Sequence, residues 1–177
     1  MPTGHSFMAM SLDGFVARTD HRLDWLIKQR TDGEDHGFFS FMASVDGLVM
    51  GSGSFRAAIG FDKWPYDKPV IVLSRTLTEA DIPPHLSSKV RLSSKTPQEL
   101  MADLKSNGWQ RVYVDGGQIV HSFLRAGLIQ DMVVTVIPIL IGSGLTMFGD
   151  PRNDINLQFL SATPFPSGLV RLNYRIT

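Results

Sequence analysis

Short apolar runs and segments of helical periodicity alternate along this chain. Apolar runs that stop at glycine, proline or polar residues predict buried strands. Such runs cover residues 5–10, 48–50, 70–73, 90–92, 111–114 and 131–141, and two further runs at 157–161 and 169–175 predict closing strands near a sheet edge. Apolar residues at helical spacing predict helices over residues 34–44, 55–59, 96–107 and 118–126.

Two of these segments carry sharper signals. Thr96-Pro97-Gln98-Glu99 combines a threonine cap, proline at the first helical position and an acid in the first turn, so it predicts a helix start. Residues 131–141 are almost wholly apolar, which favours a central strand covered on both faces. Because strands alternate with helices, the sequence predicts a mostly parallel α/β sheet of about eight strands flanked by helices, in a single domain over residues 1–177.

Charge and composition narrow the class of ligand. The chain has 17 basic and 17 acidic side chains and no cysteine. Balanced charge without a basic run argues against nucleic acid or an acidic membrane surface as partner, and the lack of cysteine excludes thiolate nucleophiles and Cys-ligated metals. No apolar stretch has the roughly 20 residues of a membrane span, and residues 1–10 do not resemble a signal peptide. We therefore expect a cytoplasmic protein that binds a small molecule.

Glycines follow several predicted strands, at the edge where the carboxyl ends of parallel strands meet. They lie in Asp13-Gly14, Gly51-Ser52-Gly53-Ser54, Asp115-Gly116-Gly117 and Gly142-Ser143-Gly144. In the third segment a strand runs into a helix start, where unpaired backbone N–H groups and the helix dipole favour phosphate. Because ligands bind at this edge of open parallel sheets, the sequence predicts a groove for a nucleotide cofactor. The alternative is a set of turns that merely need positive φ.

Other cofactor and catalytic motifs are absent. Gly51-Ser52-Gly53 lacks the third glycine of the Rossmann fingerprint, and no GxSxG nucleophile elbow occurs. The five histidines are scattered without the spacing of metal ligands, so we expect no metal site.

Six segments, in order, resemble one known family. They are Met10-Ser11-Leu12-Asp13-Gly14-Phe15-Val16-Ala17, Leu23-Asp24-Trp25, Val49-Met50-Gly51, Leu73-Ser74-Arg75, Val114-Asp115-Gly116-Gly117 and Ile137-Pro138-Ile139-Leu140-Ile141-Gly142-Ser143-Gly144. Their order and spacing resemble the reductase domain at the carboxyl end of bacterial bifunctional riboflavin-biosynthesis deaminase/reductases and its stand-alone dihydrofolate reductase-like relatives. The resemblance spans nearly the whole chain. It implies a dihydrofolate reductase-like fold, a homodimer, and NADPH as cofactor with NADH as the alternative.

The resemblance also implies cofactor contacts for individual residues. The pyrophosphate would meet Gly116, Gly117, Gln118 and Ile119, phosphate or ribose would meet Gly51, Ser52, Gly53 and Ser54, and the adenosine end would lie by Ser74 and Arg75. The nicotinamide would lie near the backbone of Ala9 and the loop that contains Leu12, Asp13, Gly14 and Val16. Family members usually carry Arg or Lys for the 2′-phosphate of NADPH where this chain has Ser52, so Arg75 or Arg56 would have to supply that charge.

The substrate end has four candidate residues. Asp35, in the helix predicted over 34–44, is the candidate proton donor or substrate anchor, and stabilising the helix start is its alternative role. Trp25 could stack on a flat substrate or cover the core, and Phe38 could line the pocket or belong to the core. Pro138 is a further candidate for substrate contact.

Three functional hypotheses follow. The first is an NAD(P)H-dependent reductase that transfers hydride to a small planar heterocycle of the pterin or pyrimidine kind. The second is a non-catalytic nucleotide- or flavin-binding protein. The third is the riboflavin-pathway 5-amino-6-(5-phosphoribosylamino)uracil reductase, although Phe39-Ser40-Phe41-Met42-Ala43 departs from the helix motif of those enzymes.

Overall fold

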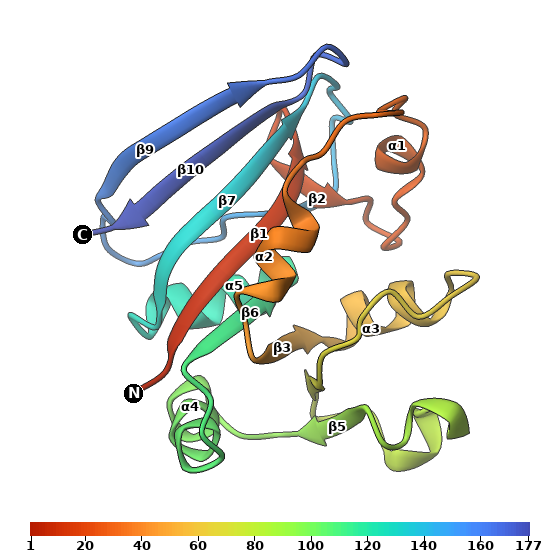
Figure 1. The fold of residues 1–177 in the computed structure, drawn as a ribbon, viewed down its shortest axis with the longest axis vertical. Coiled ribbons are helices and arrows are strands. Elements are labelled where there is room, and N and C mark those ends of the chain that lie inside the picture. Colours follow the sequence, from red (N-terminus) through yellow and green to blue (C-terminus); the bar gives the residue numbers. More distant parts are fainter.

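A single eight-stranded sheet runs through the protein (Figure 1). The computed structural model describes residues 1–177. The strands of this sheet are β1 (Thr3–Ser11), β3 (Gly47–Gly51), β4 (Val70–Leu73), β5 (Val90–Ser93), β6 (Arg111–Asp115), β7 (Ile129–Ile137), β9 (Leu157–Pro164) and β10 (Val170–Ile176). Their order is β5-β4-β3-β6-β1-β7-β10-β9. All pairs from β5 to β7 are parallel, whereas β10 pairs antiparallel with both β7 and β9. The predicted mostly parallel α/β sheet is confirmed.

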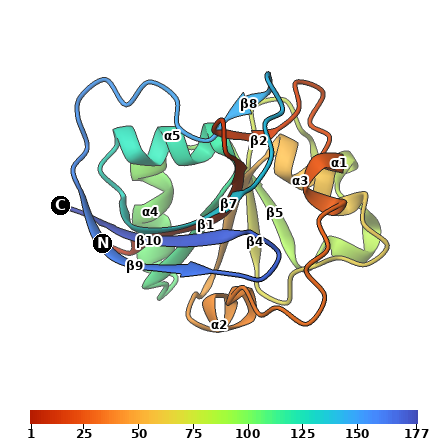
Figure 2. The ribbon, with the colours of Figure 1, turned by 90° about the horizontal axis from the view of Figure 1, so that it is seen from above.

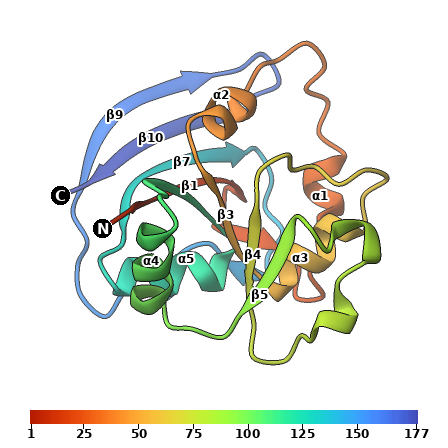
Figure 3. The same ribbon diagram turned by 60° about the horizontal axis from the view of Figure 1, so that its bottom comes forward.

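Five α-helices surround the sheet. They are α1 (Asp24–Ile27), α2 (Phe38–Ala43), α3 (Ser52–Ile59), α4 (Pro97–Ser106) and α5 (Gly117–Arg125), and two 3-10 turns, η1 (Glu79–Asp81) and η2 (Pro84–Leu86), lie between β4 and β5. Helices α4 and α5 cover one face, and α2 covers the other (Figures 2 and 3). None of these helices combines the length and apolarity that crossing a bilayer would demand.

The core follows from these layers. The largest cluster packs Leu100 and Leu104 of α4 and Val120 and Phe123 of α5 against β1, β6 and β7. A second cluster joins β3, β4 and β5 to Phe55 of α3. The predicted cap of α4 is also confirmed, because Thr96 and Glu99 form a reciprocal capping box. These contacts hold the carboxyl ends of β1, β3 and β6 in fixed register.

Several boundaries differ from the sequence prediction. The strand predicted over 131–141 ends at Ile137, because the chain leaves the sheet at Pro138, which has no N–H to donate. β7 is an interior strand, but β6 and β1 lie nearer the centre of the sheet. The helix predicted over 34–44 begins only at Phe38, since Gly37 precedes it with φ of 83°. A small ribbon of β2 (Phe15–Ala17) and β8 (Leu145–Thr146) was not predicted, because strands this short show no periodicity.

Candidate active site

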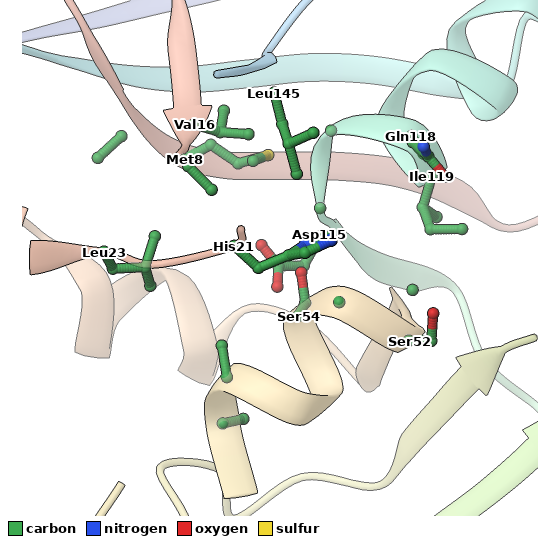
Figure 4. Close-up of a pocket in the computed structure, with 18 of the residues that line it drawn as sticks. Met8, Val16, His21, Leu23, Ser52, Ser54, Asp115, Gln118, Ile119 and Leu145 are labelled. Carbon is green, nitrogen blue, oxygen red and sulfur yellow. The ribbon is translucent and has the colours of Figure 1, made fainter. Parts of the chain in front are cut away.

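A cavity of about 380 Å³ opens at the carboxyl ends of the parallel strands. The ends of β3 and β6 and the starts of α3 and α5 form its first wall, on which Ser52, Ser54, Asp115, Gln118 and Ile119 lie (Figure 4). The ribbon of β2 and β8 adds Val16 and Leu145 above this wall. The cavity therefore lies where a parallel sheet binds ligands.

The two helices that start at this wall have no side-chain cap. Neither Gly51, before α3, nor Gly116, before α5, offers a capping side chain, whereas α4, away from the cavity, has a complete capping box. The first amides of a helix have no partner within the helix, so those of α5 are available to a ligand. Together with the positive end of the helix dipole, they favour an anion such as phosphate.

The glycines of the wall are required by space as well as by conformation. Gly116 has φ of 90°, and a Cβ there would lie 2.7 Å from the hydroxyl oxygen of Ser54. A Cβ on Gly117 would lie 2.7 Å from the carbonyl oxygen of Thr146 in β8. A side chain at Gly117 would push the start of α5 away from the backbone of β8, so this turn is more than a source of positive φ.

The rest of the cavity is mostly apolar. Phe7 and Met8 of β1, Leu23 and Leu26 around α1, Ala57 and Ala58 of α3, and Phe61 line it. The volume is of the size that holds part of a cofactor and a small aromatic ring. The cavity thus has two ends, one lined by backbone amides and hydroxyls and one by apolar side chains.

Asp115 supplies a carboxyl group between these two ends. The Ser54 hydroxyl and the Gly116 N–H lie near this carboxyl and favour its charged form. The Tyr113 hydroxyl donates to the carbonyl of Phe7 at 2.8 Å, and its oxygen lies 3.2 Å from Oδ1 of Asp115. Burial raises the pKa of Asp115 above its ordinary value, and these hydrogen bonds oppose that rise only in part. Burial and the nearby Asp115 also raise the pKa values of Tyr66 and Tyr113.

The structure brings together ten of the predicted cofactor residues. Those lining the cavity are Ala9, Val16, Gly51, Ser52, Gly53, Ser54, Gly116, Gly117, Gln118 and Ile119. Leu12 and Gly14 do not line it, and Asp13 accepts hydrogen bonds from the N–H groups of Ile141 and Gly142. Bonds from Ser11 and these amides lower the pKa of Asp13. Asp13 therefore joins two loops and does not face the cavity.

The adenosine-end residues also lie outside the lining. The Ser74 hydroxyl accepts hydrogen bonds from the N–H groups of Thr76 and Leu77, which closes the turn after β4. Arg75 follows it and is exposed, while Leu73 is the last residue of β4 to line the cavity.

None of the four substrate-end candidates is among the residues that line the cavity. Trp25 is fully buried with Ile137 and Leu169, so it is a core residue that cannot stack on a ligand. Asp35 is exposed, and its carboxylate accepts the N–H of Gly37, the residue before α2, while α2 itself has no side-chain cap. Phe38 packs edge-on against Phe7, with ring centroids 5.6 Å apart. Pro138 follows β7 and is also absent from the lining.

Sequence reasoning missed several lining residues. The sequence analysis places Asp115 only in a glycine turn. An acid at the end of a buried strand, directly before two glycines, is nevertheless a usable signal. His21 lines the cavity with φ of 66°, and no local pattern distinguishes it from a surface loop residue. Tyr66 and Phe61 come from the long segment after α3, whose path the sequence does not indicate.

A largely parallel sheet that closes with an antiparallel hairpin, and a glycine-lined cavity at its strand ends, define a dihydrofolate reductase-like α/β protein. The model of the RibD C-terminal domain matches residues 2–171. The chain therefore belongs to the RibD C-terminal domain family, as its sequence resemblance suggested.

Individual relatives agree with this assignment. The structure resembles that of a Shewanella sp. PV-4 protein whose name assigns it to riboflavin biosynthesis, with a TM-score of 0.91 and 36% identity over 99% of each chain. The uncharacterized protein YwjB of Bacillus subtilis is 26% identical over 95% of this chain and 94% of its own. The deaminase/reductase of Thermotoga maritima shares the fold, with a TM-score of 0.69 and 16% identity over 99% of this chain and 57% of that one.

Proposed function

We propose that this protein is a reductase that uses NADPH, with NADH as the alternative, to reduce a C=N or C=O group of a small planar heterocycle. The observation that carries the proposal is the wall of uncapped helix starts and glycine backbone beside an apolar cavity. Membership of a family named for a riboflavin-pathway enzyme supports an oxidoreductase of this kind.

The residues of the wall fit a dinucleotide. The N–H groups of Gly117, Gln118 and Ile119 would bind its pyrophosphate, and the hydroxyls of Ser52 and Ser54 would bind phosphate or ribose. The backbone of Ala9 and the side chain of Val16 would border the nicotinamide, which supplies the hydride when bound. The enzyme's own part is to orient the acceptor and exclude water.

Asp115 is the residue we propose as proton donor, in place of Asp35. Tyr113 has one hydroxyl proton, and the Phe7 carbonyl at 2.8 Å is a nearer acceptor than Asp115 at 3.2 Å. A protonated Asp115 would donate to the tyrosine oxygen while Tyr113 donates to Phe7, so that every group in the cluster is satisfied. The raised pKa of Asp115 favours the same protonated form. A general acid in this position contributes about 10²- to 10⁴-fold to rate.

Two alternatives keep specific support. A non-catalytic nucleotide- or flavin-binding protein would use the same wall, and Ser52, where the family resemblance implies a cation, favours it. The riboflavin-pathway reductase is favoured by the family and by the name of the Shewanella relative.

A cytoplasmic homodimer fits the exposed apolar side chains of Leu157, Phe159 and Leu160 on edge strand β9, since such surfaces often mark contacts between subunits.

Cofactor titration separates these possibilities. NADPH, NADH and FMN are added to the purified protein while nicotinamide or flavin fluorescence is followed. The proposal predicts saturable binding of NADPH below about 1 mM, which corresponds to roughly −4 kcal/mol. Binding of FMN alone would favour the flavin-binding alternative, and failure of both nicotinamides to bind would refute the reductase.

A further inference from the structure

We propose that His21 carries protons between solvent and Asp115, so that this acid regains its proton after each transfer to the acceptor. The inference rests on the proposed function and deepens it, because it concerns how the donor of that reaction is re-protonated. The step balances with water alone. An imidazolium at His21 gives one proton to the Asp115 carboxylate, and the neutral imidazole then takes one proton from water.

Asp115 needs such a partner because of its place in the cavity. It lies between the end lined by backbone amides and hydroxyls and the end lined by apolar side chains. A bound cofactor and acceptor would fill both ends and exclude water from the carboxyl. A general acid must regain a proton before it can act again. The proton therefore has to come through a side chain that touches both the cavity and solvent.

His21 is the lining residue suited to this task. The residues of the cavity that can lose a proton are His21, Tyr66, Tyr113 and Asp115. Burial and the nearby Asp115 raise the pKa of both tyrosines, so they keep their protons near neutral pH. The Tyr113 hydroxyl proton is also engaged by the Phe7 carbonyl at 2.8 Å. Histidine, in contrast, is the side chain that gains and loses a proton near neutral pH.

The imidazole lies where it can reach both solvent and Asp115. His21 is exposed, yet its side chain lines the cavity. Its Nδ1 lies 2.9 Å from the place that a Cβ on Gly53 would take, so the ring packs on the first turn of α3, next to Ser54. Figure 4 draws His21, Ser54 and Asp115 in the same part of the cavity. The Ser54 hydroxyl lies near the Asp115 carboxyl and can accept one proton while it donates another, so it can pass a proton from the ring to the acid.

A tight turn holds His21 in this place. Its φ of 66° is a conformation that residues with a side chain rarely adopt, and such strain persists only where the surroundings enforce it. The N–H of His21 donates to the carbonyl of Arg18 at 2.9 Å, and the N–H of Arg18 donates to the carbonyl of Arg22 at 3.0 Å. Ion pairs of Arg18 with Asp24 and of Arg22 with Asp20, both at 2.6 Å, close the turn. The charged groups of the turn therefore have partners of their own.

The elements that pack against His21 leave Asp115 as its charged counterpart. Arg56, the charged residue of α3, lies in the last turn of that helix, away from the start on which the imidazole packs. On β6, Arg111 begins the strand at the opposite edge of the sheet, and Asp115 ends it at the cavity. The protonation of Asp115 can therefore follow that of His21.

A spectroscopic experiment tests the inference without an acceptor. Infrared difference spectra of the protein saturated with NADP⁺, taken against Asp115→Asn, give the carbonyl band of protonated Asp115 as pH rises. In His21→Asn this band should persist to higher pH, because no imidazolium then favours the charged carboxylate. Asparagine tolerates a positive φ, so the turn at residue 21 is kept. The matched control is His85→Asn, at an exposed histidine of η2 outside the cavity, which should leave the pH dependence of the band unchanged.

A kinetic experiment uses two acceptor probes, 7,8-dihydropterin and the 5-amino-6-(5-phosphoribosylamino)uracil named for the Thermotoga maritima enzyme. Oxidation of NADPH is followed in weakly buffered solution. His21→Asn should lower kcat about tenfold or more while Kd for NADPH stays within about twofold, and added imidazole should restore kcat because it delivers the proton itself. His85→Asn should match the unchanged protein. Thermal melting checks that each variant folds, and His21→Gln replaces His21→Asn if the latter does not.

The outcomes separate this inference from the proposed function. An Asp115 band with the same pH dependence in His21→Asn and in the unchanged protein overturns the relay, and so does a kcat that stays unchanged or falls without recovery in imidazole. Absence of a protonated Asp115 band at every pH removes Asp115 as the donor and the relay with it. If neither probe is reduced, the infrared result decides. Failure of NADP⁺ and NADPH to bind the unchanged protein refutes the proposed function instead.

Discussion

Gly116→Ala should selectively remove cofactor binding. Gly116 has φ of 90° and ψ of 133°, a backbone conformation that costs a residue with a side chain about 1–3 kcal/mol. The new Cβ would also lie 2.7 Å from Ser54 Oγ, so the Ser54 side chain must turn away. Relief of the backbone strain at residue 116 should displace the amides at the start of α5, which follow this residue directly. Losing one hydrogen bond to a charged group costs about 1.5–3 kcal/mol, which is roughly a 10- to 150-fold rise in Kd for NADPH.

Gly108→Ala is the matched control. Gly108 has φ of 80° after α4, and no atom lies within 4 Å of the position a Cβ would take. Both variants place a Cβ on a glycine of positive φ, so both should lose about 1–3 kcal/mol of unfolding free energy by calorimetry. Fluorescence titration with NADPH should separate them, because Gly108 is outside the cavity. Equal Kd values for the two variants would refute the assignment of the Gly116 turn to the cofactor.

Four further predictions concern charge. Asp115→Asn should stabilise the protein increasingly as pH rises. A carboxyl with a raised folded pKa stabilises the protein most below its unfolded pKa of 3.8, and this stabilisation is lost as pH rises through the folded pKa. Melting temperatures of both proteins from pH 4 to 8 test this prediction, and parallel curves would contradict it. Arg75→Ala should raise Kd for NADPH about fivefold, as for a screened surface charge, and leave NADH unchanged; equal losses would mean that Arg75 does not contact the 2′-phosphate. Glu34→Ala should lower the melting temperature, since the Glu34 carboxylate accepts the N–H and the hydroxyl of Ser167, both at 2.7 Å. Asp35→Ala should leave NADPH affinity and turnover unchanged, and lost turnover would restore Asp35 as the proton donor.

The sheet could be predicted because its signals are local. Buried strands such as β4 are continuous apolar runs in the sequence, and the capping box of α4 is formed by Thr96 and Glu99, which are three residues apart. Glycines at the ends of β3 and β6 indicated the first wall of the cavity for a similar reason, because parallel strands bring their carboxyl ends to one edge. The prediction for this wall therefore needed only the order of the elements.

The apolar end could not be predicted in the same way. Trp25 and Phe38 are aromatic residues whose side chains could face a ligand or the core, and only the path of the chain between α1 and α2 decides that they face the core. The sequence places Asp35 inside a predicted helix, but the helix begins only at Phe38, and the Asp35 carboxylate is exposed. Tyr113, whose hydroxyl lies beside Asp115, meets the Phe7 carbonyl across more than 100 residues of sequence, a contact that no local pattern contains.

The most direct test of the central claim is a crystal structure of the protein soaked with NADPH. The account predicts that the diphosphate lies on the N–H groups of Gly117, Gln118 and Ile119, with the nicotinamide beside Ala9 and Asp115 facing the space left for the acceptor. A diphosphate bound anywhere else, or a nicotinamide directed away from Asp115, would contradict it.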